Sequence, residues 1–215
     1  FIDLANSVAG SASGGPAKVA VVASALEGMV SGSSVANTVG SGSITIPLMK
    51  KTGYRAEFAG AVEAAASTGG QIMPPIMGAA AFLMTEYVNE PYGQIAVRAI
   101  LPAVLYFLGI FIAVHLEAKK FGLRGIPRSE LPKFSQLIRK IYLLAPLVIL
   151  IYLVTSNSNT IQVSASIAII VAVVASLFDK DNRITPKRFF EALAAGARGT
   201  ITVAVAVSYT HLRAH

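Results

Sequence analysis

The chain has 215 residues, of which 54% are hydrophobic and only 13% charged, and its formal net charge at pH 7 is +7. So few charged side chains cannot cover a soluble core of this size, whereas a helical bundle surrounded by lipid needs charges only in its loops. The basic residues lie in short loops, which favours membrane orientation over nucleic-acid binding, and the absence of cysteine excludes disulfides and cysteine-ligated metals. These features predict an all-α polytopic membrane protein that contacts the lipid bilayer and no nucleic acid.

The first predicted elements are the end of a preceding helix with its loop, over residues 1–15, and a helical hairpin over residues 16–49. The hairpin has two apolar limbs separated by SGSSVAN. At 1.5 Å rise per residue each limb supplies only about half to two thirds of a crossing. Lys18 and Lys50 lie at the two ends of the hairpin, which places both ends on the same side of the membrane. The pattern predicts a re-entrant hairpin that enters from the cytoplasm, turns inside the membrane and returns.

The next predicted element is an interrupted transmembrane helix over residues 56–87. Its middle reads STGGQIMPP, from Ser67 to Pro75. Proline removes a backbone donor and clashes with the preceding helical turn, so a continuous helix is improbable there. We expect two half-helices with an unwound linker at membrane depth.

Two interruptions so close in sequence predict one shared site, because unwound backbone is tolerated in a bilayer only where protein or water satisfies it. Freed carbonyls and neutral side-chain oxygens are suited to Na⁺, and half-helix N-termini to an anionic substrate group. The candidate side chains are those of Ser31, Ser33, Ser34, Ser67, Thr68, Asn37 and Gln71.

Other interpretations of these motifs remain open. Small residues also pack helix backbones closely, and Gly/Ser runs also form flexible linkers. Glu27 and Glu63 lie within apolar limbs, where an ionisable group is a candidate proton or cation partner. Alternatively, Glu27 caps the tip of the hairpin and Glu63 pairs with another helix of a longer chain.

Three later segments, over residues 95–117, 141–156 and 161–178, are predicted to span the membrane. The loop over residues 118–140 is strongly basic and is therefore predicted to be cytoplasmic. This assignment places NEPY, from Asn89 to Tyr92, outside and Lys50, Lys51 and Arg55 in the cytoplasm.

Two other functions, an intramembrane protease and a nucleotide-driven pump, are disfavoured by the sequence, which leaves a carrier or a channel. An intramembrane serine protease needs a base, and the three histidines are His115, far from the serines in sequence, and two in the last five residues. A nucleotide-driven pump is disfavoured because GxxxxGK[ST] does not occur. A channel or pore-forming subunit stays as the alternative, since channel filters are also unwound backbone.

Two long motifs, GMVSGSSVANTVGSGSITIPLMKKTGY from residue 28 and FAGAVEAAASTGGQIMPPIMGAAAFLM from residue 58, resemble the large membrane subunit of TRAP transporters, the tripartite ATP-independent periplasmic carriers. The resemblance covers residues 1–207 and is strongest over residues 28–84. It is nearest to the fused permeases that work with a TAXI-type binding protein.

The resemblance implies an elevator-type secondary carrier of the prokaryotic inner membrane, not an enzyme, with two inverted repeats and Na⁺ as coupling ion. It would import organic acids delivered by a soluble periplasmic protein. Residues 16–89 would belong to the moving transport domain and residues 93–207 mainly to the scaffold. The site residues that it implies are Ser31, Gly32, Ser33, Ser34 and Asn37 at the hairpin tip, and Ser67, Thr68, Gly69, Gly70, Gln71, Pro74 and Pro75 in the broken helix, with Na⁺ at Ser33, Asn37, Thr68 and Gly69.

The sequence also departs from this family. The second hairpin and its broken helix are missing, so we expect transport to need that second half and the small membrane region of the permease. The ending SYTHLRAH, over residues 208–215, interrupts an apolar helix and is interpreted as a truncation or sequencing artefact. The substrate itself is not predicted.

Overall fold

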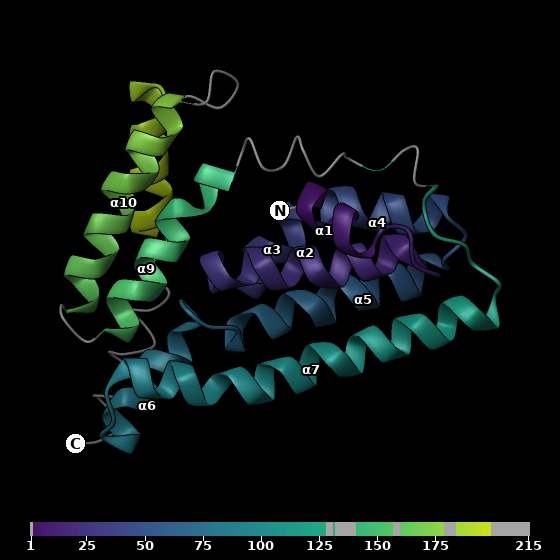
Figure 1. Cartoon of the computed structure of the whole chain (residues 1–215), viewed down its shortest axis with the longest axis horizontal. Helices are drawn as coiled ribbons and strands as arrows, with labels where there is room; N and C mark the ends of the chain where they lie inside the picture. Colours follow the sequence, from purple (N-terminus) through teal and green to yellow (C-terminus); the bar gives the residue numbers. More distant parts are fainter. Residues whose placement is uncertain (1, 128–130, 132–140, 157–159, 179–183, 199–215) are drawn as a thin grey trace. The chain divides into compact units, whose positions relative to one another are not determined.

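The computed structural model describes residues 2–127, 131, 141–156, 160–178 and 184–198. Throughout these residues every regular element is a helix, which confirms the predicted all-α class. The chain divides into two compact units, Phe1–Ile141 and Tyr142–His215. Figure 1 labels their helices. The predictions for much of the basic loop and for the 208–215 tail lie outside the described residues.

The first unit begins with two packed helices, α1 (Ile2–Ala9) and α2 (Gly15–Ser31). Small buried side chains fill their contact. Helix α2 ends at Gly32, whose φ of 60° lies in the left-handed region that favours glycine. The Gly32 N–H donates to the Gly28 carbonyl at 3.0 Å and closes the last turn.

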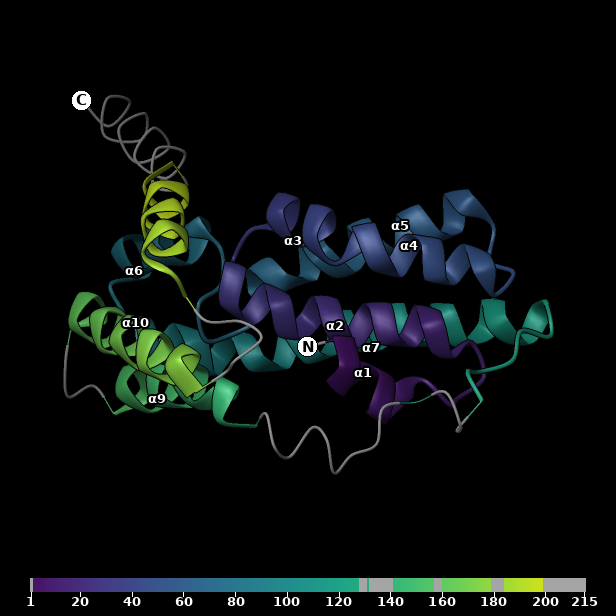
Figure 2. The ribbon, with the colours of Figure 1, turned by 90° about the horizontal axis from the view of Figure 1, so that it is seen from above.

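The chain then turns back as α3 (Ser34–Gly40) and α4 (Gly42–Lys51). Ser33 is extended, and its hydroxyl accepts the Ala36 N–H at 3.3 Å, which is an N-cap. Ser41, between the two helices, keeps right-handed helical angles, so the return limb is nearly continuous. Residues 15–51 therefore form a helical hairpin (Figure 2); its re-entry into a bilayer stays a prediction.

The following helix is interrupted, but later than the sequence predicted. Helix α5 (Ala56–Gly69) continues into a 3-10 turn, η1 (Gly70–Ile72), and the second limb is α6 (Ala79–Val88). Ser67 was expected to begin the unwound part and is instead helical. The interruption begins at Met73, which is extended as the residue before a proline usually is. The prolines therefore end this helix, and the two glycines before them do not.

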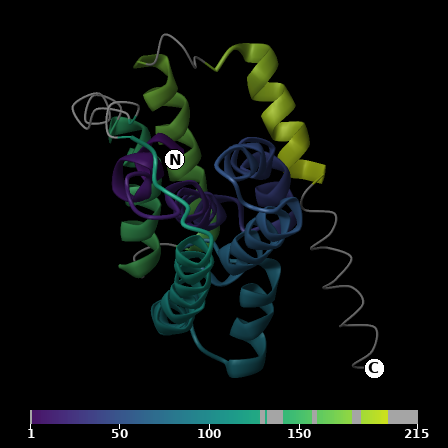
Figure 3. The ribbon, with the colours of Figure 1, turned by 90° about the vertical axis from the view of Figure 1, so that its right-hand side faces the viewer.

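Helix α7 (Tyr92–Lys120) packs along α2, α5 and α6. It is the one helix among the described residues that is long and apolar enough to cross a membrane. Helices α2, α5 and α7 are seen nearly end-on in Figure 3. Their shared core consists of Ala17, Ala20, Val21, Met49, Tyr54, Ala59, Val62, Ala66, Val114 and Ala118.

Three segments that the sequence assigned to one side of the membrane meet at one end of this unit. Arg55 forms an ion pair with Glu117 at 3.3 Å, and the Gly14 N–H donates to the Leu123 carbonyl at 3.3 Å. The Tyr54 hydroxyl donates to the Gly14 carbonyl at 3.3 Å. Burial raises the pKa of Tyr54 to about 12, so this donor stays protonated. The common end agrees with the predicted topology.

The second unit contains apolar helices that are shorter than α7. A 3-10 turn, η3 (Ile141–Leu144), leads into α9 (Ala145–Thr155), which packs against α10 (Ile161–Phe178). Pro146 falls within the predicted span over residues 141–156. Pro146 lies in the first turn of α9. The backbone N–H that proline lacks would have no partner within the helix there, so the helix tolerates it. Residues 186–198 form a further helix.

Candidate substrate and cation site

The hairpin and the broken helix touch through glycine backbone. A Cβ built on Gly28 of α2 would overlap the Gly70 Cα, and one built on Gly70 would lie 2.7 Å from the Gly28 Cα. Such a close approach leaves no room for any side chain on either residue. The predicted site residue Gly70 is thus the place where η1 crosses α2.

The turn of the hairpin contacts the linker of the broken helix. A Cβ on Gly32 would overlap the Met77 carbonyl oxygen, and Gly32 also has its left-handed φ of 60°. The linker is closed on itself by the Gly78 N–H, which donates to the Gln71 carbonyl at 2.7 Å. The two interruptions, which are more than 35 residues apart in the printed sequence, therefore lie against each other.

Asn37 is the candidate ligand that lies deepest at this contact. Its side chain is fully buried, and its Nδ2 donates to the Ser24 carbonyl at 2.9 Å. The same nitrogen would lie 3.3 Å from a Cβ on either Gly28 or Gly70. Its Oδ1 lies 3.4 Å from the Ser41 hydroxyl. Asn37 thus places an amide directly beside the glycine crossing.

The other three residues expected to hold Na⁺ make their contacts away from the crossing of α2 and η1. The Ser33 hydroxyl caps its own helix. Thr68 is exposed and its hydroxyl donates to the Ala64 carbonyl at 2.8 Å. Gly69 faces the Tyr106 ring of α7, which a Cβ on it would approach to 2.6 Å. Of this set, only Asn37 has its side chain at the crossing of α2 and η1.

The remaining candidates are spread over the two interruptions. The Ser31 hydroxyl accepts the Ser33 N–H at 3.4 Å. Ser67 points back along α5, and its hydroxyl donates to Glu63 at 3.3 Å. Ser34 opens α3, Gln71 is exposed in η1, and Pro74 and Pro75 form the linker.

Two tyrosines of α7 support the broken helix and were missed from sequence. The Tyr92 hydroxyl donates to the Pro75 carbonyl at 3.0 Å and also contacts the Ile76 carbonyl. The Tyr106 hydroxyl donates to the Ala65 carbonyl at 3.0 Å. Tyr92 was assigned only to an outer loop, NEPY. Backbone carbonyls near the break are thus satisfied by side chains.

Glu63 is the centre of a second polar cluster. Ser41 and Thr45 each lie 2.5 Å from its carboxylate, one on each oxygen, and Ser24 donates to Oε1 at 2.9 Å. With Ser67, four hydroxyls surround one carboxylate, and all five side chains are at most 1% exposed. The alternative that Glu63 pairs with a helix outside this segment is not needed. Spacings of four residues, Ser41 to Thr45 and Glu63 to Ser67, were the available sequence signal.

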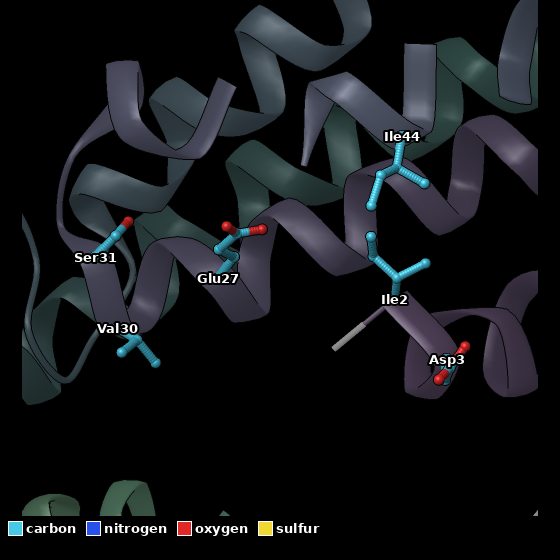
Figure 4. Close-up of a pocket in the computed structure, with 6 residues that line it drawn as sticks. All are labelled: Ile2, Asp3, Glu27, Val30, Ser31 and Ile44. Carbon is cyan, nitrogen blue, oxygen red and sulfur yellow. The ribbon is translucent and has the colours of Figure 1, made fainter. Parts of the chain in front are cut away.

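Glu27 lies on the flank of the hairpin. A Cβ on Gly40 would approach its Oε1 to 2.7 Å, which places the Glu27 carboxylate beside the return limb; the alternative that Glu27 caps the tip of the hairpin stays a prediction. It lines an open cavity of about 700 Å³ together with Ile2, Asp3, Val30, Ser31 and Ile44. Figure 4 shows Ile2 and Ile44 pointing towards each other beside Glu27.

Known proteins with similar sequences are transporters. The family described as "Tripartite ATP-independent periplasmic transporter, DctM component" matches residues 1–213. The C4-dicarboxylate TRAP transporter large permease protein DctM of Pseudomonas aeruginosa is 29% identical over 83% of this chain and 42% of its own length. The sialic acid TRAP transporter large permease protein SiaM of Vibrio cholerae is 26% identical over 96% of this chain and 48% of its own length.

A third relative, the sialic acid TRAP transporter permease protein SiaT of Haemophilus influenzae, is 30% identical over 64% of this chain and 21% of its own length. The chain thus spans less than half the length of each of these relatives. Their shared class is the membrane permease, not an enzyme. The match over nearly the whole chain shows that it belongs to the family of TRAP transporter large permeases.

Proposed function

We propose that the chain is the first half of a Na⁺-coupled permease that imports organic acids delivered by a periplasmic binding protein. The relatives' names give C4-dicarboxylates and sialic acid as cargo, and both are carboxylates. The proposed location is the prokaryotic inner membrane, with several crossings. The proposed partners are a binding protein of the TAXI type, the second half of the permease and its small membrane region.

The observation that carries this proposal is the contact between the two interruptions. Gly32 of the hairpin meets Met77 of the linker, and Asn37 lies beside the Gly28–Gly70 crossing. Helix ends and backbone carbonyls at one place suit an ion with hard oxygen ligands and an anionic group, and the Asn37 Oδ1, 3.4 Å from the Ser41 hydroxyl, is a further oxygen in this region. In this proposal residues 16–89 supply one wall of the site and the absent second half supplies the other.

Transport by the complete permease tests the proposal. We would reconstitute it in liposomes with its binding protein and offer a panel of carboxylates, including C4-dicarboxylates and sialic acid. Accumulation is expected only with an inward Na⁺ gradient and with the binding protein present. Uptake that is indifferent to both would favour a channel and overturn the carrier proposal.

Asn37 provides the sharper test of the site. Asn37→Ala removes an amide beside the glycine crossing, and we expect it to raise the Na⁺ concentration needed for half-maximal uptake about tenfold, as loss of roughly 1.4 kcal/mol of binding energy would. Ser43→Ala is the matched control, because Ser43 is exposed on the same hairpin and its hydroxyl serves only the Gly40 carbonyl at 2.8 Å. Equal Na⁺ dependence in the two variants would leave Asn37 as a packing residue.

A further inference from the structure

The Glu63 cluster joins three segments of the chain. Ser24 comes from α2, Ser41 and Thr45 from the return limb of the hairpin, and Glu63 and Ser67 from α5. Both limbs of the hairpin therefore bind one carboxylate that belongs to the broken helix. The contact is buried on all sides.

The hydroxyls can satisfy this carboxylate without a cation. Each supplies one hydrogen, and a carboxylate offers about four acceptor positions. Ser41 and Thr45 also lie near the Asn37 and Ser41 carbonyls, but those carbonyls already accept the Ser41 and Thr45 backbone N–H groups at 2.9 Å. Each carbonyl has two lone pairs, so the Ser41 and Thr45 hydroxyls can donate either to Glu63 or to these carbonyls. Removing the carboxylate would remove the one acceptor that all four buried hydroxyls share, which is costly in an apolar bundle.

The cluster is also connected to the candidate ion ligand. The Ser41 hydroxyl that contacts Glu63 lies 3.4 Å from the Asn37 Oδ1, and the Asn37 Nδ2 is bonded to the carbonyl of Ser24. Asn37, Ser41 and Thr45 follow one another at helical spacing of four residues. The orientation of the Asn37 amide therefore depends on the residues that Glu63 holds.

We propose that Glu63 is a positioning residue: its carboxylate fastens both limbs of the hairpin to α5, so that the hairpin and the broken helix move as one body and Asn37 keeps its orientation. The role is that of a hydrogen-bond acceptor. Glu63→Gln keeps the shape and one acceptor oxygen, and a neighbouring hydroxyl can rotate to accept from the amide N–H groups that replace the other oxygen. The effect on Asn37 rests on the proposed Na⁺ site, whereas the effect on the hairpin does not.

Distances between spin labels in the complete permease test the fastening directly. The 215 residues contain no cysteine, so once any cysteines in the rest of the permease are replaced, labels can be placed at Ala36→Cys on α3 and Ala64→Cys on α5, both exposed positions. We expect a narrow distance distribution in the parent protein and in Glu63→Gln, and a broad one in Glu63→Leu. Should Glu63→Leu not fold, the double variant Ser41→Ala, Thr45→Val removes two donors and should broaden the distribution in the same way.

Thermal stabilisation by NaCl, with choline chloride as the reference salt, tests the second effect without a substrate. We expect Glu63→Gln to keep the NaCl concentration for half-maximal stabilisation within about twofold, and Ser41→Ala to raise it about fivefold, the loss that one hydrogen bond commonly causes. Glu57→Gln is the matched control, because Glu57 is exposed in the first turn of the same helix.

Three results would overturn the proposal. A narrow distribution in the double variant would show that the cluster does not fasten the hairpin. A folded Glu63→Gln protein with a broad distribution would show that an amide cannot replace the carboxylate at this contact, and one that no longer responds to NaCl would show that the negative charge acts on the ion and not only through Asn37. Because the distance measurement needs no transport, failure of the proposed carrier function would be seen separately.

Discussion

Two of the contacts between the hairpin and the broken helix are chemically opposite. At the Gly28–Gly70 crossing the backbones touch because there are no side chains. At Glu63, five buried polar side chains meet through hydrogen bonds. The first contact depends on shape and rejects any added atom. The second depends on donors and acceptors and should accept an isosteric change.

The largest expected effect comes from filling the glycine crossing. Gly28→Val places atoms on top of Gly70, and we expect the free energy of unfolding to fall by about 3 kcal/mol or more. Gly60→Ala is the control, because a Cβ on Gly60 meets nothing within 4 Å and alanine favours the helix by about 1 kcal/mol. Thermal unfolding of the complete permease in detergent measures both, and equal melting temperatures would refute the backbone contact.

The turn contact at Gly32 is expected to be the next most sensitive. Gly32→Ala combines a left-handed backbone with overlap of the Met77 carbonyl, for a loss of about 2 kcal/mol or more. Gly122→Ala isolates the backbone part, because Gly122 has a φ of 64° and a Cβ on it would meet no atom of the described residues within 4 Å. The extra loss of melting temperature in Gly32→Ala over that in Gly122→Ala measures the contact with the linker. Equal losses would mean that only the left-handed backbone conformation of Gly32 matters.

A single donor at the polar contact should matter less than either glycine. Ser24→Ala removes one hydrogen bond to Glu63, and we expect a loss of about 1 kcal/mol. Ser43→Ala, on the exposed face of α4, should change stability by less than about 0.5 kcal/mol. Thermal unfolding separates them, and a Ser24 variant as stable as the Ser43 variant would argue that the hydroxyl contributes nothing.

The smallest expected effect is at the exposed end of the bundle. The Arg55 side chain is 66% exposed where it pairs with Glu117, and solvent screens such a pair strongly. Arg55→Gln should lower the free energy of unfolding by less than about 1 kcal/mol, and only at low ionic strength. Melting curves at two salt concentrations check this. A loss as large as that of Ser24→Ala at high salt would show that the pair is better shielded than its exposure indicates.

Local chemistry was enough to predict where the helices are interrupted. Gly32 and Ser33 form the turn of the hairpin, and Pro74 stops the second helix because proline restricts the residue before it. The start of that break was placed too early, at Ser67. Glycine lowers helix propensity by only about 1 kcal/mol, so packing against α2 and α7 keeps Gly69 and Gly70 in helical turns.

The partners of the buried groups could not be predicted from one sequence. Ser24 is 39 residues from Glu63, and Ser41 is 22 residues away, so only the pairing of the limbs brings them together. The same holds for Tyr92, which lies 17 residues from the Pro75 carbonyl that it binds. Local patterns made Asn37 a candidate ligand at the tip of the hairpin, but did not show which atoms it would bind.

The contacts of α7 also decide where any sliding surface can lie. Tyr92 in its first turn holds the linker, Tyr106 holds α5 in its middle, and Glu117 near its end pairs with Arg55. Sliding of those elements along α7 would have to break all three contacts. If the hairpin and the broken helix move during transport, we therefore expect α7 to move with them, although the division implied by the sequence put residues 93–207 mainly in the scaffold. The sliding surface would then lie along the outer face of α7, where Leu101 is 66% exposed, or beyond it.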